Sequence, residues 1–384
     1  MDFDLQWLLL GLPLTFAIGW IASRFDVRQW RREQKDSPKA YYKGLNLLLN
    51  EQQDKAIDAF IEAVQQDPDT SDLHFALGNL FRRRGEYERA VRVHEHLLHR
   101  ADLPASERAR AQHELAQDFM KAGLFDRAEE AYKALDGSSF DTEARLALLT
   151  LHERSRDWRA AAEVAQKLEQ RGTGSFASRI SHYWCEIALE ADAKHQTDEA
   201  DAALKRAREA APQAARPLVL AGQRAARSAD HAEVLALWGV LAVAHPAAFN
   251  LVARDYAKSA LASGGTAAAL ERLQELDKRT PTQDLLEAIT LLDPEPAHQR
   301  QRLLDHLREH PSLSAAQGLL AQAAASGFNE AESKAVLDAV GRAAAPLRRY
   351  RCAACGFEAQ HYFWQCPGCL SWDSYPPQRL EDLG

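Results

Sequence analysis

The sequence predicts an all-α protein: a superhelix of repeated helical hairpins, with a transmembrane helix at its N-terminus and a small metal-binding knob at its C-terminus. Three observations predict this architecture. An uncharged apolar segment opens the chain, and a pattern with a period of about 34 residues runs through its middle. Four of the five cysteines lie close to the C-terminal end.

The apolar segment runs from Leu5 to Ala22 and contains no charged residue. Because each helical residue rises about 1.5 Å, the segment spans about 27 Å, close to the roughly 30 Å of a bilayer core. A cleaved signal peptide is the alternative. Such peptides begin with basic residues, whereas Asp2 and Asp4 precede this apolar run. We therefore expect residues 1–23 to form a transmembrane anchor.

The charges that flank this segment predict its orientation. Basic residues follow the segment and none precedes it, and the positive-inside rule places such a flank in the cytoplasm. These residues are Arg24, Arg28, Arg31, Arg32, Lys35 and Lys39. We expect a single membrane pass, a short N-terminus on the far side, a juxtamembrane linker over residues 24–38 and the bulk of the chain in the cytoplasm.

Residues 39–345 show the self-similarity of tetratricopeptide repeats, which are pairs of antiparallel helices with a period of about 34 residues. Small residues recur one period apart where the helices press together, as Gly44 and Gly78 do, and Ala56 and Ala90. Later copies are weaker, and we expect about nine repeats in all. Stacked repeats form a superhelix with a concave binding face, and nothing in that architecture is catalytic.

Several aromatic residues fall at positions that such repeats use for packing. We expect these side chains in the core and assign them no chemical role. They are Tyr87, Phe125, Trp158 and Trp184.

Asn79 and Arg83 are the candidate partner-binding residues of the repeats. They lie one helical turn apart near the end of a predicted helix, where both could point into the groove and hold the backbone or a carboxylate of a partner. A solvated surface is the alternative, because cations are favourably placed near a helix C-terminus. Both interpretations remain open from the sequence.

The C-terminal cysteines form two Cys-x-x-Cys pairs in residues 346–384, which we expect to be a separate metal-binding domain. The four residues are Cys352, Cys355, Cys366 and Cys369. Two such pairs can aim four thiolates at one point, and a closed tetrahedral site of this kind is structural because no position is free for water. Two disulfides or a thioredoxin-like redox pair are the alternatives. The sequence does not decide between iron and zinc.

The pattern of these pairs resembles the metal knuckles of rubredoxins, and the order of all the parts resembles the lipopolysaccharide assembly protein B family of Gram-negative bacteria. The most specific matching pieces are Arg31–Gln34 after the anchor, Tyr41–Asn46 at the first repeat, and Tyr350–Cys352. One departure is Leu370, where a rubredoxin knuckle usually has glycine. That departure puts an iron-type redox geometry in doubt more than it does metal binding.

The resemblance implies a non-enzymatic adaptor in the inner membrane. Members would bring the lipid A deacetylase LpxC to the membrane protease FtsH, and would thereby hold lipopolysaccharide synthesis in balance. Proteins of lipopolysaccharide transport or signalling are further expected partners, and a homodimer is possible. The family's metal ligands would be the four C-terminal cysteines.

Two other functions are consistent with the sequence. One is a scaffold for envelope assembly complexes that acts without proteolysis, and the other is an electron-transfer protein with iron at the four cysteines. A nucleic-acid partner is not expected, because the net charge is −8.

Overall fold

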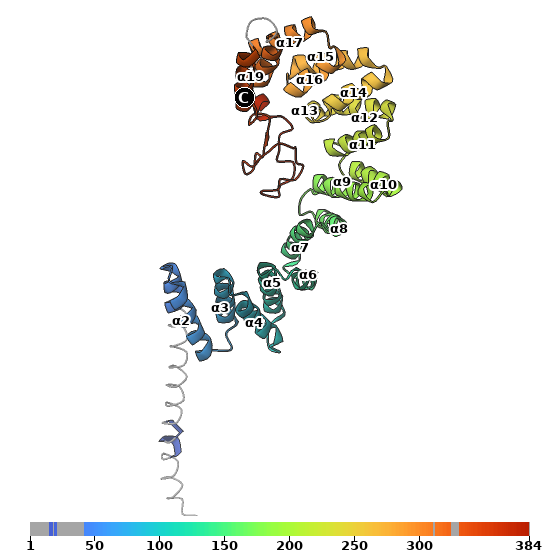
Figure 1. The fold of residues 1–384 in the computed structure, drawn as a ribbon. Helices are drawn as coiled ribbons and strands as arrows, with labels where there is room; N and C mark the ends of the chain where they lie inside the picture. Colours follow the sequence, from blue (N-terminus) through green and yellow to red (C-terminus); the bar gives the residue numbers. More distant parts are fainter. Residues whose placement is uncertain (1–14, 18, 21–41, 310–311, 324–329, 384) are drawn as a thin grey trace, which may run out of the picture. The chain divides into compact units, whose positions relative to one another are not determined.

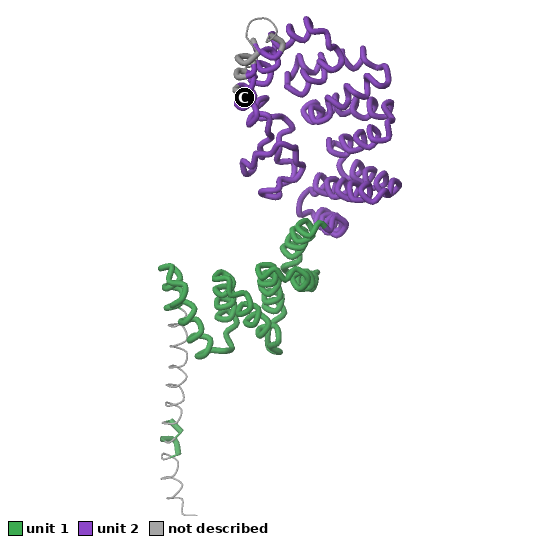
Figure 2. Tube along the Cα trace, in the orientation of Figure 1, with its two compact units in different colours: residues 1–156 green, residues 157–384 purple. Residues whose placement is uncertain are grey.

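The structure is a computed structural model of the chain that divides into two compact units, Met1–Arg156 and Asp157–Gly384 (Figure 2). It describes residues 15–17, 19–20, 42–309, 312–323 and 330–383. The expected anchor over residues 1–23 lies mostly outside these residues, and the linker over residues 24–38 lies wholly outside them. Within the described ranges, no helix is both long enough and apolar enough to cross a bilayer.

The first unit is a series of helices in which each helix packs against the next. Residues 42–49 are helical and precede the labelled helices (Figure 1). These helices are α2 (Gln53–Gln66), α3 (Ser71–Arg84), α4 (Tyr87–His99), α5 (Ala105–Ala122), α6 (Phe125–Lys133) and α7 (Asp141–Ser155).

The second unit is a series of helices that ends in the cysteine-bearing segment, which lies along the inner side of the arc that its helices form (Figure 1). Its first helices are α8 (Trp158–Gln170), α9 (Ala177–Ala193), α10 (Thr197–Ala210), α11 (Ala215–Arg227), α12 (His231–Ala244) and α13 (Pro246–Phe249). They are followed by α14 (Ala253–Ser263), α15 (Thr266–Arg279), α16 (Gln283–Leu292), α17 (Pro296–Glu309), α18 (Leu313–Ala323) and α19 (Glu330–Ala344). The C-terminal segment adds strands β1 (Tyr350–Arg351) and β2 (Glu358–Ala359), which pair antiparallel, and a 3₁₀ helix, η1 (Leu380–Leu383).

A contact between a glycine and an aromatic ring recurs in the helical hairpins and shows why the small residues repeat. Gly44 faces Phe60, Gly78 faces His94, and Gly222 faces Trp238, each glycine lying sixteen positions before its partner. A Cβ atom at any of these glycines would overlap the ring. The first helix of each pair can therefore approach the second closely enough to bury the ring completely or nearly so.

Within the described part of residues 39–345, the secondary structure is helical, as the sequence predicts. The prediction that the aromatic side chains lie in the core is only partly confirmed. Trp158 is buried as expected, but Phe125 is 46% exposed, so its assignment to the core is wrong. Phe125 is the first residue of α6, whose buried residues are Ala128, Ala131 and Tyr132.

Candidate metal centre and its docking surface

The two Cys-x-x-Cys pairs form two tight turns with the same backbone conformation. In the first turn the Gly356 amide donates to the Cys352 carbonyl at 2.9 Å, and in the second the Leu370 amide donates to the Cys366 carbonyl at 2.8 Å. Both turns end in the left-handed region, with φ at 77° for Gly356 and 59° for Leu370. The departure at Leu370 therefore leaves the turn intact, although a side chain at positive φ costs roughly 1 kcal/mol or more.

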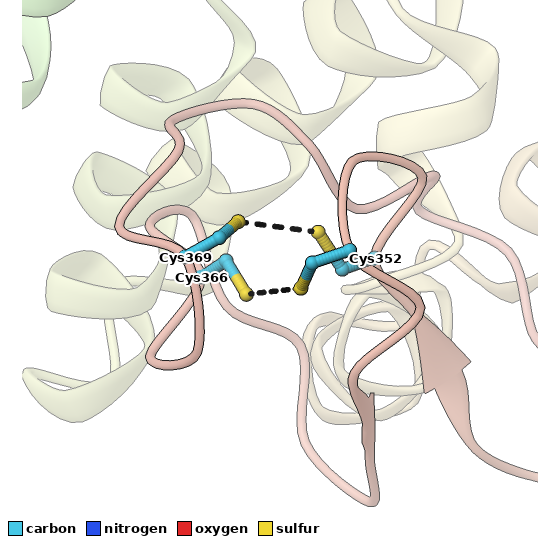
Figure 3. A group of neighbouring side chains, drawn as sticks. Cys352, Cys366 and Cys369 are labelled. Atoms are coloured by element: carbon cyan, nitrogen blue, oxygen red, sulfur yellow. Dashed lines mark hydrogen bonds between the residues drawn. The ribbon is translucent and has the colours of Figure 1, made fainter. Parts of the chain in front are cut away.

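The four sulfur atoms lie within 4.8 Å of one another and face a common centre (Figure 3). The Cys352 and Cys369 Sγ atoms are 3.9 Å apart, and the Cys355 and Cys366 Sγ atoms are 3.7 Å apart. A tetrahedral ion with bonds of about 2.3 Å to sulfur requires sulfur separations of about 3.8 Å. A disulfide requires about 2.05 Å, so the disulfide alternative does not describe this geometry. The site fits one metal ion, iron or zinc.

Hydrogen bonds around the thiols favour the charged form that a metal ion needs. Burial disfavours the Cys352 thiolate, but Ser374 and the amides of Cys355 and Ala354 lower its pKa to about 6. The side chain and amide of Ser371 likewise lower the pKa of Cys369. The pKa of Cys355 moves to about 12, because the amide of Phe357 is outweighed by burial and by the neighbouring thiols. A cation shared by the four sulfurs would stabilise their thiolate forms.

The buried core of this domain is small. Its core contains Tyr350, Cys352, Cys366 and Tyr375, so two of its four buried residues are ligands. The Tyr375 hydroxyl donates to the Phe357 carbonyl at 3.2 Å, and the domain has only one pair of two-residue strands. A core this small depends on its metal site for most of its stability.

Trp372 docks the domain onto the inner side of the second unit. Its ring stacks on His182 of α9 with centroids 4.6 Å apart and an interplanar angle of 16°. The edges of Tyr183 and Trp158 meet it at 6.0 Å and 6.2 Å. The Arg216 guanidinium of α11 lies over the same ring at 5.8 Å. The Trp372 ring is therefore surrounded by residues from α8, α9 and α11.

Asp373 adds a polar contact beside this stack. His182 Nε2 donates to Asp373 Oδ2 at 2.8 Å, and Ser178 Oγ donates to the same oxygen at 2.9 Å. Although partial burial opposes ionisation, the His182 hydrogen bond and charge keep the pKa of Asp373 below its usual value. Arg216, which is only 4% exposed, is paired with Glu186 at 2.6 Å.

A second attachment joins the end of the chain to later helices. Arg379 forms a two-pronged ion pair with Asp284 of α16, at 3.1 Å and 3.0 Å. Glu381 accepts hydrogen bonds from the Ser312 hydroxyl at 2.8 Å and the Ser314 hydroxyl at 2.7 Å. The domain is thus held at two places, near α9 and near α16 and α18.

The candidate partner-binding residues lie on α3 in the first unit and have different surroundings. Asn79 is half-buried, and its side-chain oxygen accepts a hydrogen bond from Arg82. Arg83 is exposed, and no ion pair to it is found in the described part of the chain. Within the described residues, no hydrogen bond joins their side chains. A role in binding a partner stays a prediction for both.

Arg82, not Arg83, is at the centre of a network that the sequence pattern did not reveal. Its guanidinium bonds to Asp118 at 2.9 Å and to Glu114, both on α5. The other oxygen of Asp118 accepts a hydrogen bond from His94 Nδ1 at 2.6 Å, and both of these side chains are fully buried. The only sequence signal was an acidic residue at a buried helical position, and a single sequence does not show which base it meets.

Comparison with known proteins decides the family. The chain is 32% identical to the lipopolysaccharide assembly protein B of Escherichia coli strain K12, over 98% of each chain. This chain belongs to the lipopolysaccharide assembly protein B family. The Haemophilus influenzae member is 25% identical over 97% of this chain and 98% of its own. Residues 350–376 match the family model described as the rubredoxin metal binding domain.

Solved structures of helical repeat proteins are similar at lower identity. A chain of the Naa15/Naa10 complex bound to HypK-THB is 14% identical with a TM-score of 0.42, over 80% of this chain and 51% of that chain. YrrB, a tetratricopeptide repeat protein with an unusual peptide-binding site, is 15% identical with a TM-score of 0.33, over 50% and 96% of the two chains.

In this member of the lipopolysaccharide assembly protein B family, the residues that the sequence analysis missed are those of the docking surface. His182, Ser178 and Arg216 lie more than 150 positions before Trp372 and Asp373. The contacts of Trp372 lie on α8, α9 and α11. The useful signal was the unusual density of aromatic residues around the second cysteine pair.

Proposed function

We propose that this chain is a non-enzymatic adaptor in lipopolysaccharide assembly. The observation that carries the proposal is the relationship to the Escherichia coli protein of that name along nearly the whole length of both chains. Relationship over the whole length supports a shared arrangement of surfaces, which is what an adaptor uses.

The architecture supports binding over catalysis. Helical hairpin arrays present extended surfaces to other proteins. In the metal site, all four ligand positions of a tetrahedral ion are supplied by cysteines, so the ion would hold the domain together and would leave no position for a substrate.

At a finer level, we propose that the chain brings the deacetylase LpxC to the protease FtsH at the inner membrane and so promotes its degradation. An apolar N-terminal segment with basic residues after it supports attachment to the membrane with the repeats on the cytoplasmic side. Confinement beside a membrane protease raises the effective concentration of a bound substrate without any new contact between substrate and protease.

The first unit is our candidate for the partner-binding surface. In the second unit the metal domain already lies against α9, α11, α16 and α18. On α3, by contrast, Arg83 is exposed and has no ion pair within the described residues. A cation at this position, on the same helix as the half-buried Asn79, can donate hydrogen bonds to a carboxylate or a backbone carbonyl of a partner segment.

Reconstitution tests the adaptor directly. Purified FtsH and the full chain would be placed in lipid vesicles with soluble LpxC, and the rate of LpxC loss would be followed with and without the chain. An adaptor increases that rate several-fold, and Arg83→Ala reduces the increase while Arg92→Ala, a change of another exposed cation on α4, does not. An unchanged rate would favour a scaffold that assembles envelope proteins without proteolysis.

A further inference from the structure

The loop that carries Trp372 and Asp373 belongs to the metal site and to the docking surface at once. On one side, the Cys366 amide donates to the Ser371 carbonyl at 2.9 Å, and the Ala353 amide donates to the Ser374 carbonyl at 2.7 Å. Each of these bonds ties the loop to a turn that holds the metal ligands. On the other side, Trp372 and Asp373 contact His182.

The ligand sulfurs themselves contact this loop. Cys352 Sγ lies 3.3 Å from the Ser374 hydroxyl, and the Asp373 amide donates to the Trp364 carbonyl just before the second cysteine pair, at 2.9 Å. Asp373 also holds a positive φ of 50°, in the left-handed region. The orientation of the docking side chains is therefore set by the closed metal site.

The second attachment makes no hydrogen bond to either cysteine turn within the described residues. Arg379 bonds to Asp284, Glu381 bonds to Ser314, and the Arg348 guanidinium donates to Ser314 Oγ at 3.1 Å. These residues lie outside both cysteine pairs, and their contacts are to side chains of α16 and to residues at the start of α18. They would keep the end of the chain in place if the metal site opened.

We propose that the metal ion acts as a latch. When the four thiolates hold the ion, Trp372 and Asp373 cover the inner faces of α9 and α11. When the ion is lost, the two turns lose their common centre, the loop is released from His182, and the domain stays attached through its contacts with α16 and α18, which include those of Arg348, Arg379 and Glu381. Metal occupancy then decides whether an aromatic and cationic surface, made by Trp158, His182, Tyr183 and Arg216, is covered.

Fluorine NMR of the full chain, labelled with 5-fluorotryptophan, tests the latch. The chain has eight tryptophans. The signals of Trp372 and Trp364 would be assigned by their loss from the spectra of Trp372→Phe and Trp364→Phe. Metal would be removed with a chelator under reducing conditions and restored with zinc or iron(II) alone. We expect the Trp372 signal to shift and to gain sensitivity to deuterated solvent in the metal-free chain, and to return when metal is restored. Trp184 and Trp238, whose rings make no aromatic contact with the metal domain among the described residues, should change little.

Two results would overturn the latch. One is a Trp372 signal that keeps its position although the metal has been removed. The other is a change in Trp184 and Trp238 as large as that in Trp372, because the loss of metal would then unfold the unit in general.

Reciprocity gives a second test in which metal binding itself is the readout. If metal binding increases the equilibrium constant for docking of the loop, docking must increase the affinity for the metal by the same factor. We expect His182→Ala to weaken zinc affinity several-fold in competition with a chelator, although His182 lies outside the ligand set. His195→Ala, at an exposed position after α9, is the matched control and should leave the affinity unchanged. Equal affinities in His182→Ala and the unaltered chain would contradict the coupling.

Discussion

Leu370 adopts the same left-handed backbone after its cysteine pair as Gly356 adopts after the other, with φ at 59° and 77°. The two turns therefore have the same backbone shape but differ in conformational free energy, because an L side chain is disfavoured at positive φ and glycine is not. The position where this chain departs from the rubredoxin pattern is a site of stored strain, and the metal site maintains it.

The first prediction follows from this difference. Leu370→Gly should stabilise the metal domain by up to about 1 kcal/mol, and Gly356→Ala should destabilise it by about 1 kcal/mol. Since folding of this domain is coupled to metal binding, each change appears as roughly a fivefold shift in zinc retention against a chelator, in opposite directions. Weaker retention in Leu370→Gly would show that the side chain, which is 44% exposed, contributes contacts that outweigh the strain.

A second prediction concerns the close approach of the helices at Gly222. Its Cβ would overlap the Trp238 ring, which is fully buried, so Gly222→Ala should lower the free energy of unfolding by about 1–3 kcal/mol. Gly318→Ala is the matched control in α18, where the nearest atom to the added Cβ is 3.5 Å away. That change should be neutral or should stabilise by up to about 1 kcal/mol. The midpoint of urea unfolding measures both effects, and equal midpoints for the two variants would contradict the packing argument.

A third prediction addresses the buried network of the first unit. Asp118→Ala removes one of the two acidic partners of Arg82 and leaves the His94 side chain buried without its partner. Breaking a buried pair in this way costs about 3–5 kcal/mol. Lys133→Ala in the same unit removes an exposed pair with Glu129 and should cost no more than about 0.5 kcal/mol. Comparable losses in the two variants, measured by urea unfolding, would show that the network adds nothing beyond a surface pair.

A fourth prediction is a dependence of stability on pH at Asp382. Burial, together with the charges of Asp284 and Glu381, outweighs the Gln283 amide and raises the pKa of Asp382 to about 6 from 3.8. Between these values the folded chain holds a proton that the unfolded chain has released. The stabilisation is therefore complete below about pH 4 and is lost as the pH rises through 6.

Asp382→Asn isolates that effect, since other acids titrate in both chains. The variant should become more stable relative to the unaltered chain as the pH rises from 4 to 7, measured as the difference in unfolding midpoint. A difference that stays constant over this range would show that Asp382 is ionised in the folded state.

The sequence predicted the parts of this molecule whose residues are close together in the chain. The four ligands lie within two short motifs whose spacing determines a tetrahedral site, and the repeated Gly and Ala positions follow from the contact of two adjacent helices. The pairing of Trp372 with His182 depends on how the whole second unit curves, and a local pattern carries no information about it. Arg82 and Arg83 are neighbours in the sequence, and only the position of α5 decides which of them meets Asp118.

The central claim is that this chain acts as an adaptor for regulated proteolysis, and the half-life of LpxC in living cells tests it most directly. Synthesis would be stopped in cells depleted of the chain and in cells that express it again, and LpxC would be followed by immunoblotting. The account predicts that depletion lengthens the half-life several-fold, that the restored chain shortens it, and that a chain with all four ligand cysteines replaced by serine does not. A half-life that is the same with and without the chain would contradict the claim.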